Sequence, residues 1–127
     1  MNMKLFEIYT KRKIYVDLDD IRGTWISKQK GTQREKVAFL RKICKKEKIM
    51  NFYDLGANYG EFSVGLQDVV HNVYSFEPNK NVVSCLKETA LLYNNITVYD
   101  TAISTDDKDK ILHYNEKYSG GGRLEKN

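Results

Sequence analysis

The sequence has little of the residue types that build metal and disulfide sites. Its 127 residues include one proline, two cysteines and two histidines. Cys44 and Cys85 lie far apart and lack the close spacing of zinc or redox motifs, so we interpret both as buried thiols. His71 and His113 are isolated from any carboxylate cluster at ligand spacing. We therefore expect no metal site.

Long apolar runs are also lacking. No run approaches the ~18 apolar residues of a membrane span, and the first residues lack the apolar segment of a signal peptide. We expect a cytoplasmic protein with no membrane span. Hydrophobic residues make up 41% of the chain and charged residues 30%, which is typical of a folded globular domain and argues against a disordered chain.

The formal net charge of +4 is concentrated in one segment. Residues 32–49 place Val37, Leu40 and Cys44 on one helical face and crowd basic residues onto the rest. Thr32, with Glu35 three residues later, resembles a capping box. A solvated amphipathic helix explains this charge, so binding of nucleic acid is the less favoured interpretation.

The first 31 residues form a unit of their own in the pattern. Two apolar runs, Leu5–Thr10 and Ile14–Leu18, predict a β-hairpin. Gly23 and the acids before it indicate a turn, after which Trp25 and Ile26 should anchor a linker. We divide the chain into this hairpin and linker, 1–31, and a main domain.

The main domain, 32–127, alternates strand and helix patterns. An α/β fold is expected, with strands at about Ile49–Leu55, Val73–Pro78, Ile96–Asp100 and Ile111–Asn115, and helices at about Gly60–Val70 and from Asn79, as N-cap, to Tyr93.

The first strand ends in a glycine turn, and the second ends in a carboxylate. Gly56 and Gly60 allow close approach of the backbone to a ligand. Glu77 follows roughly twenty residues later, at the end of the next strand, from which a carboxylate can accept hydrogen bonds from ribose hydroxyls. Asn58 stands where a dinucleotide-binding fingerprint would have its middle glycine, so binding of NAD is the less favoured interpretation. The pattern predicts a nucleoside cofactor.

Two strings carry a resemblance to a known family: DLGANYGEFS at 54–63 and FEPNKNVVSCLKETALLYNNITVYDTAIS at 76–104. Together they resemble FkbM-type methyltransferases over about residues 35–124. The resemblance implies the N-terminal half of a Rossmann-like class I methyltransferase sheet and the cofactor S-adenosylmethionine. It also implies that the loop of Asp54, Gly56, Ala57, Asn58 and Gly60 receives the methionine part and that Glu77 holds the ribose.

The loop after the third strand should pass the base of such a ligand. Ala102 is small enough for an adenine to lie flat, and Asp100 could accept from its amino group; a solvated acid is an equal interpretation of Asp100. Thr105–Asp109 is interpreted as a polar hairpin turn in preference to a calcium loop. Ser119–Arg123 is flexible by composition, and we expect either a flap over the substrate or a disordered tail.

The family pattern continues with a strand-four D-x-E-G segment that has no counterpart here. Strand one would then have an open edge. The chain could be a fragment or a truncated gene product, or another element could cap the edge. The N-terminal hairpin, a second copy or a companion chain are the candidates for that cap.

The resemblance favours O-methylation of a hydroxyl on a sugar or a secondary metabolite. Direct displacement at a sulfonium needs no enzyme nucleophile, and no residue stands out as the general base, so the catalytic residues stay unassigned. The alternatives are an inactive remnant that binds only the cofactor or a partner chain, and an RNA methyltransferase.

Overall fold

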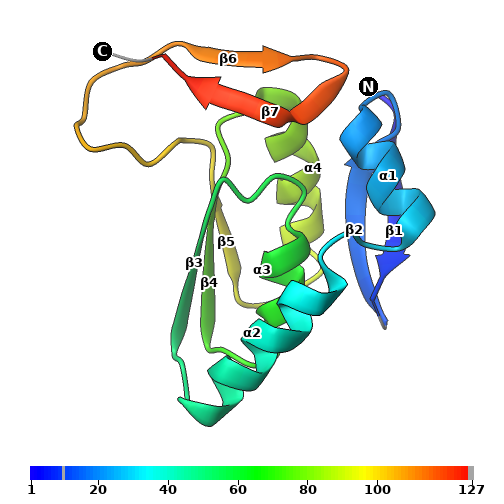
Figure 1. The fold of residues 1–127 in the computed structure, drawn as a ribbon, viewed down its shortest axis with the longest axis vertical. Helices are drawn as coiled ribbons and strands as arrows, with labels where there is room; N and C mark the ends of the chain where they lie inside the picture. Colours follow the sequence, from blue (N-terminus) through cyan, green and yellow to red (C-terminus); the bar gives the residue numbers. More distant parts are fainter. Residues whose placement is uncertain (10, 126–127) are drawn as a thin grey trace.

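The computed structural model describes residues 1–9 and 11–125. Figure 1 shows its order of elements, in which two antiparallel hairpins flank an α/β unit. The elements are β1 (Met3–Ile8), β2 (Arg12–Asp17), α1 (Ile21–Gln29), α2 (Arg34–Lys46), β3 (Asn51–Leu55), α3 (Glu61–Leu66), β4 (Asn72–Phe76), α4 (Lys80–Ala90), β5 (Ile96–Tyr99), β6 (Leu112–Asn115) and β7 (Tyr118–Leu124).

Three parallel strands form the central sheet, in the order β3-β4-β5. Side chains alternate between its faces, so Asp54, Val73 and Ser75 are buried against the helices. Parallel neighbours require crossover connections, and α3 and α4 supply them. The α/β class expected from the sequence is confirmed.

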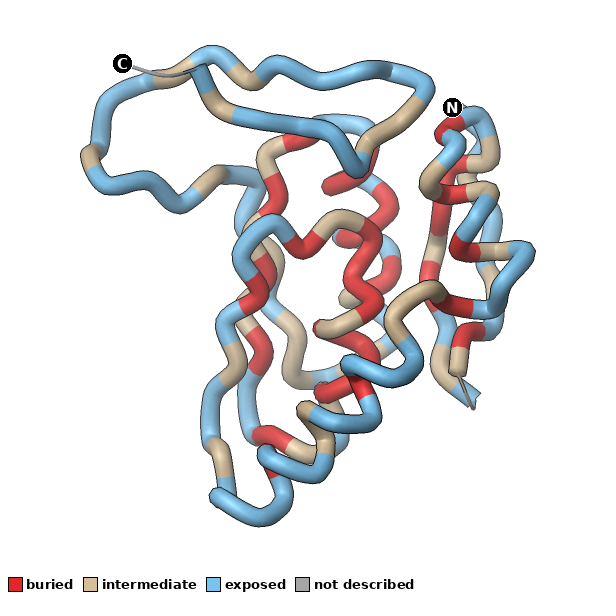
Figure 2. The backbone as a smooth tube through the Cα atoms, in the orientation of Figure 1, coloured by how far each residue is buried: buried red, intermediate tan, exposed pale blue. Residues whose placement is uncertain are grey.

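The helices lie on one face of this sheet (Figure 1). Figure 2 shows the buried backbone concentrated along α3 and α4. On α4, the buried Val82, Cys85 and Leu86 recur at helical spacing, and the Asn79 side chain accepts from the Asn81 N–H as the predicted N-cap. Both cysteines are free and buried, as expected.

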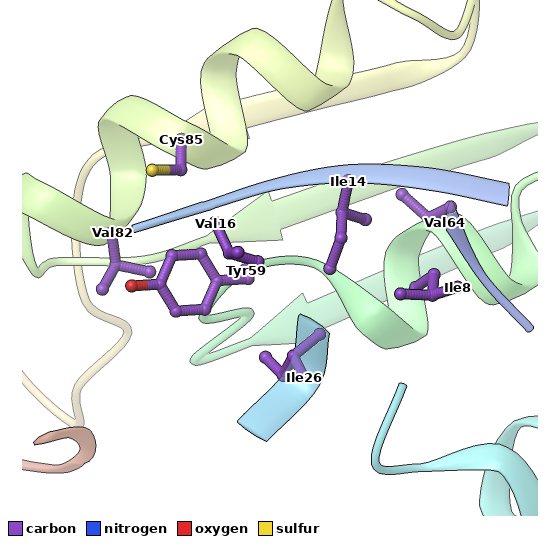
Figure 3. Close-up of a cluster of buried hydrophobic side chains, with 8 residues drawn as sticks. All are labelled: Ile8, Ile14, Val16, Ile26, Tyr59, Val64, Val82 and Cys85. Atoms are coloured by element: carbon purple, nitrogen blue, oxygen red, sulfur yellow. The ribbon is translucent and has the colours of Figure 1, made fainter. Parts of the chain in front are cut away.

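The β1–β2 hairpin and α1 pack on the far side of α3 and α4 from the sheet. Ile14 and Val16 of β2 and Ile26 of α1 share one core with Tyr59 and Val64, as Figure 3 shows. Residues 1–31 and the main domain therefore bury their apolar surfaces against each other, which is the dominant stabilising contribution at such a contact.

Two predictions at the start of the chain are wrong. Gly23 lies inside α1 and not in a turn, because a helix there packs directly on β2: a Cβ at Gly23 would lie 2.2 Å from the Asp17 carbonyl oxygen. Thr32 does not cap α2, whose N-cap is Gln33. The Thr32 side chain is hydrogen bonded to Glu61 instead, so no capping box forms.

Further along the chain, α3 ends at Leu66, short of the predicted Val70. Residues 105–109 form no hairpin turn, because the hairpin that follows them turns at 116–117. Ser119–Arg123 is not a disordered tail but part of β7, paired with β6. Strand pairing satisfies its backbone groups and overrides the flexible composition.

The N-terminal hairpin does not cap β3. It packs on α4, and β3 is an edge strand of the central sheet. The sheet face opposite the helices carries Tyr53 (59% exposed), Leu55 (58%) and Tyr99 (41%). Tyr53 stacks on Tyr74 within it. In the described part of the chain no element covers this face (Figure 1).

No helix among the described residues is long and apolar enough to cross a membrane.

Candidate functional site

The glycine turn connects β3 to α3 and folds back onto β4. The N–H groups of Gly56 and Ala57 both donate to the Phe76 carbonyl, each at 2.9 Å. Gly56 and Asn58 have positive φ values of 72° and 52°, which glycine adopts freely and asparagine tolerates. A Cβ at Gly56 would meet nothing within 4 Å, so this position is open toward solvent or a ligand.

Glu77 follows β4 and is 6% exposed. Its Oε1 accepts from the Asn58 N–H at 2.7 Å, and its Oε2 accepts from the Asn79 N–H at 2.9 Å. One carboxylate thus joins the glycine turn to the start of α4. Burial raises the pKa of Glu77, although these two hydrogen bonds oppose the shift. Each oxygen keeps a lone pair for a further donor.

A cavity of about 370 Å³ opens between the glycine turn, the end of β4 and the β6–β7 hairpin. This volume is within the range of small-molecule sites. Of the predicted cofactor residues, Gly56, Ala57, Asn58 and Glu77 line it.

Asp54 and Gly60 are absent from this lining and support the turn from beneath. The buried Asp54 carboxylate accepts from the Ser63 hydroxyl at 2.6 Å, which ties α3 to β3. Burial raises the pKa of Asp54. Gly60 has φ 92°, and a Cβ there would lie 2.7 Å from a Leu86 methyl group. The positive φ selects glycine at this position, and the Leu86 methyl group would also have to move to admit a side chain.

Asp100 and Ala102 lie apart from the glycine turn. They line a second depression, of about 350 Å³, which shares Pro78 and Leu112 with the cavity. Asp100 is exposed and forms a salt bridge with Lys87 at 3.0 Å, and this interaction lowers its pKa. The structure therefore brings four of the eight predicted residues to one cavity and leaves these two beside it.

The β6–β7 hairpin covers the cavity and is attached to α1 by Asp20. This buried carboxylate accepts from the Ser119 N–H at 2.9 Å, the Tyr59 hydroxyl at 2.6 Å and the Arg22 N–H at 3.2 Å. Trp25 also packs against Tyr118 of β7, with ring centroids 5.5 Å apart. Ser119 in turn accepts from the Asn58 side chain at 3.2 Å.

Several lining residues were missed by the sequence reasoning, chiefly Arg22, Gln33, Glu61 and Tyr118. Arg22 falls in the segment interpreted as a linker, and no local motif marks it. The glycine-rich run at 119–123 did carry a signal, because a flap was one of its two interpretations. The structure places this run in β7, and Ser119, Gly120 and Gly122 line the cavity.

The charges of the cavity wall are few. Arg22, Glu61 and Glu77 are the charged lining residues, so the described wall carries a formal charge of −1. Neither His71 nor His113 belongs to this lining. Among the described residues no group of three or more histidine, cysteine or acidic side chains is arranged to hold a metal ion.

Comparison with protein-family models finds no match for this chain, and comparison with the curated proteins finds none either.

Replacing Asp20 with alanine should loosen the β6–β7 hairpin. Alanine removes both acceptor oxygens, so the Ser119 N–H loses its partner, at a cost of about 1–3 kcal/mol. Hydrogen–deuterium exchange of the Ser119 amide should accelerate by roughly tenfold or more. Asp19→Ala, at an exposed neighbour, is the control. Unchanged exchange in Asp20→Ala would show that Asp20 does not hold the hairpin.

Proposed function

We propose that the chain binds S-adenosylmethionine in this cavity and belongs to the FkbM-type methyltransferases that its sequence resembles. The observation that carries the proposal is the buried Glu77 carboxylate at the end of β4, in the same cavity as the Gly56–Asn58 turn at the end of β3. Ligands of open α/β sheets bind at the carboxyl ends of the strands.

The residues present fit such a ligand. Each oxygen of Glu77 has a free lone pair, so the carboxylate can accept the two ribose hydroxyls without losing its bonds to the backbone. Gly56 leaves open space beside the turn, where the methionine part would lie. The Asn58 Oδ1 atom is buried and has no hydrogen-bond partner, so it can accept from a donor on a ligand.

The charge of the wall also favours this ligand over a dinucleotide. S-adenosylmethionine carries a sulfonium, an ammonium and a carboxylate, hence a net charge of +1, which complements the wall charge of −1. A pyrophosphate would bring two negative charges to a wall with two carboxylates and one guanidinium. RNA methylation would need a basic surface beside the cavity, and Arg22 is the only cation among the described residues that line it.

The reaction supported by the resemblance is O-methylation of a hydroxyl on a sugar or secondary metabolite. The bound cofactor supplies an electrophilic methyl group, and the chain aligns the acceptor oxygen with it. The β6–β7 hairpin, with Tyr118 and Ser119 against the cavity, would exclude water from the site. We assign no general base.

A second candidate function is binding without turnover, with the uncovered sheet face as the contact to another chain. Tyr53, Leu55 and Tyr99 expose an uncharged apolar surface beside the unpaired edge of β3. Exposed apolar surface of this kind marks an association site. We infer that a second copy of this chain covers it, because a symmetric contact would bury these side chains of both copies and bring no like charges together.

Glu77→Ala should weaken cofactor binding strongly. S-adenosylmethionine and S-adenosylhomocysteine should give heat on calorimetric titration of the wild-type chain, and the variant should lose roughly tenfold to a thousandfold in affinity through two charge-assisted hydrogen bonds. Glu88→Gln, an exposed acid on α4, is the matched control. Wild-type chain that binds neither compound, or a variant that binds both equally well, would contradict the proposal.

Leu55→Lys should weaken self-association, since it places a charge on the apolar face. Light scattering after size-exclusion chromatography should show a dimer for the wild-type chain and a monomer for the variant. Leu91→Lys, at an exposed leucine that follows α4, should leave the dimer unchanged. A wild-type monomer at all concentrations tested would refute the self-association.

A further inference from the structure

Arg22 reaches the cavity from a part of the chain outside the resemblance to methyltransferases. It is the second residue of α1, and its backbone N–H donates to the side chain of Asp20, the N-cap of this helix, at 3.2 Å. Its side chain is 21% exposed and lines the cavity together with residues of the glycine turn. Among the described residues that line the cavity, Arg22 is the only cation.

The ion pair with Glu61 holds the Arg22 side chain in place and leaves most of its N–H donors available. Glu61 is buried and already accepts from the Tyr9 hydroxyl at 2.8 Å, the Thr32 hydroxyl at 2.7 Å and the Thr32 N–H at 2.5 Å. Arg22 adds one longer contact of 3.3 Å through a single nitrogen. A guanidinium has five N–H donors, so the others can serve a ligand.

Asn58 offers the opposite chemistry on the same cavity. Its Nδ2 donates to Ser119, and its buried Oδ1 has no partner. A buried acceptor without a donor costs free energy, and a ligand N–H group would remove that cost. The cavity thus presents donors for an anion at Arg22 and an acceptor for a cation at Asn58. An α-amino acid carries both groups on one carbon.

We propose that Arg22 binds the α-carboxylate of the ligand and that Asn58 Oδ1 accepts from its α-ammonium. This inference rests on the proposed function and deepens it, because it makes the amino-acid end of the ligand a recognised part. It also gives residues 1–31 a role in binding, because α1 supplies the only cation among the described residues that line the cavity.

Two probes separate the halves of such a ligand. S-adenosylhomocysteine has the amino-acid end, and 5′-methylthioadenosine lacks it but keeps the adenosine and the sulfur. The wild-type chain should bind the first more tightly. In calorimetric titration, Arg22→Gln should lower the affinity for S-adenosylhomocysteine by roughly tenfold to a hundredfold, because a charge-assisted hydrogen-bonded pair is lost. The affinity for 5′-methylthioadenosine should stay within about twofold, since that probe makes no contact with Arg22.

Two further variants control for charge and for folding. Lys28→Gln removes a cation from the exposed last turn of the same helix and should change neither affinity. Arg22→Lys keeps the charge beside Glu61 but loses the planar fork, so its loss for S-adenosylhomocysteine should be smaller than that of Arg22→Gln. If Arg22→Gln does not fold, the Arg22→Lys variant makes the same comparison.

The outcomes distinguish this inference from the proposed function. Equal affinity of the wild-type chain for the two probes would overturn the role of Arg22 and leave the nucleoside site standing. An equal loss for both probes in the Arg22 variants, or no loss for either, would overturn it too. Binding of neither probe to the folded wild-type chain would overturn both proposals.

Discussion

The buried carboxylate of Glu77 is the interaction on which the site depends. Its two oxygens accept from the backbone of Asn58 and of Asn79, so a single side chain fixes the glycine turn against the start of α4. Burial alone disfavours the charged form, and the two N–H groups offset part of that cost. A buried carboxyl group whose oxygens stay open to further donors is costly for folding. Such groups cluster at functional sites.

A second buried carboxylate, Asp20, connects three segments that are distant in the sequence. Its carboxylate caps the N-terminus of α1, accepts from the Tyr59 hydroxyl beside the glycine turn and accepts from the Ser119 N–H of β7. The N-terminal segment and the β6–β7 hairpin therefore contact each other, and both contribute residues to the wall of one cavity. Opening the hairpin would break the Ser119 bond to Asp20 and the bond from the Ile21 N–H to the Lys117 carbonyl, which couples access to the cavity to the start of α1.

The periodic segments of the fold could be predicted from the sequence. Strand-length apolar runs gave β3, β4 and β5, and the spacing of Val82, Cys85 and Leu86 with the Asn79 cap gave α4. These signals are local, and their physical causes lie within a few residues of each other. The same holds for the glycine turn, where positive φ values at Gly56 and Gly60 select glycine.

The rest depends on contacts between distant segments. Gly23 has the composition of a turn, but packing of α1 on Asp17 requires a residue without a side chain inside the helix. Thr32 resembles a cap, but Glu61, 29 residues away, takes its hydroxyl. Arg22 belongs to no motif, and it reaches the cavity only because α1 packs against the β1–β2 hairpin and β7. Asp100 shows the converse: its place after the third strand suggested a contact with the ligand, but its carboxylate forms a salt bridge with Lys87 at the surface.

The most direct test of this account is a crystal structure of the chain grown with S-adenosylhomocysteine. The account predicts the adenosyl ribose within hydrogen-bond distance of both Glu77 oxygens, and the amino-acid end between Asn58 and Arg22. The compound bound only in the depression beside Asp100, or absent from crystals in which the cavity is free of lattice contacts, would contradict it.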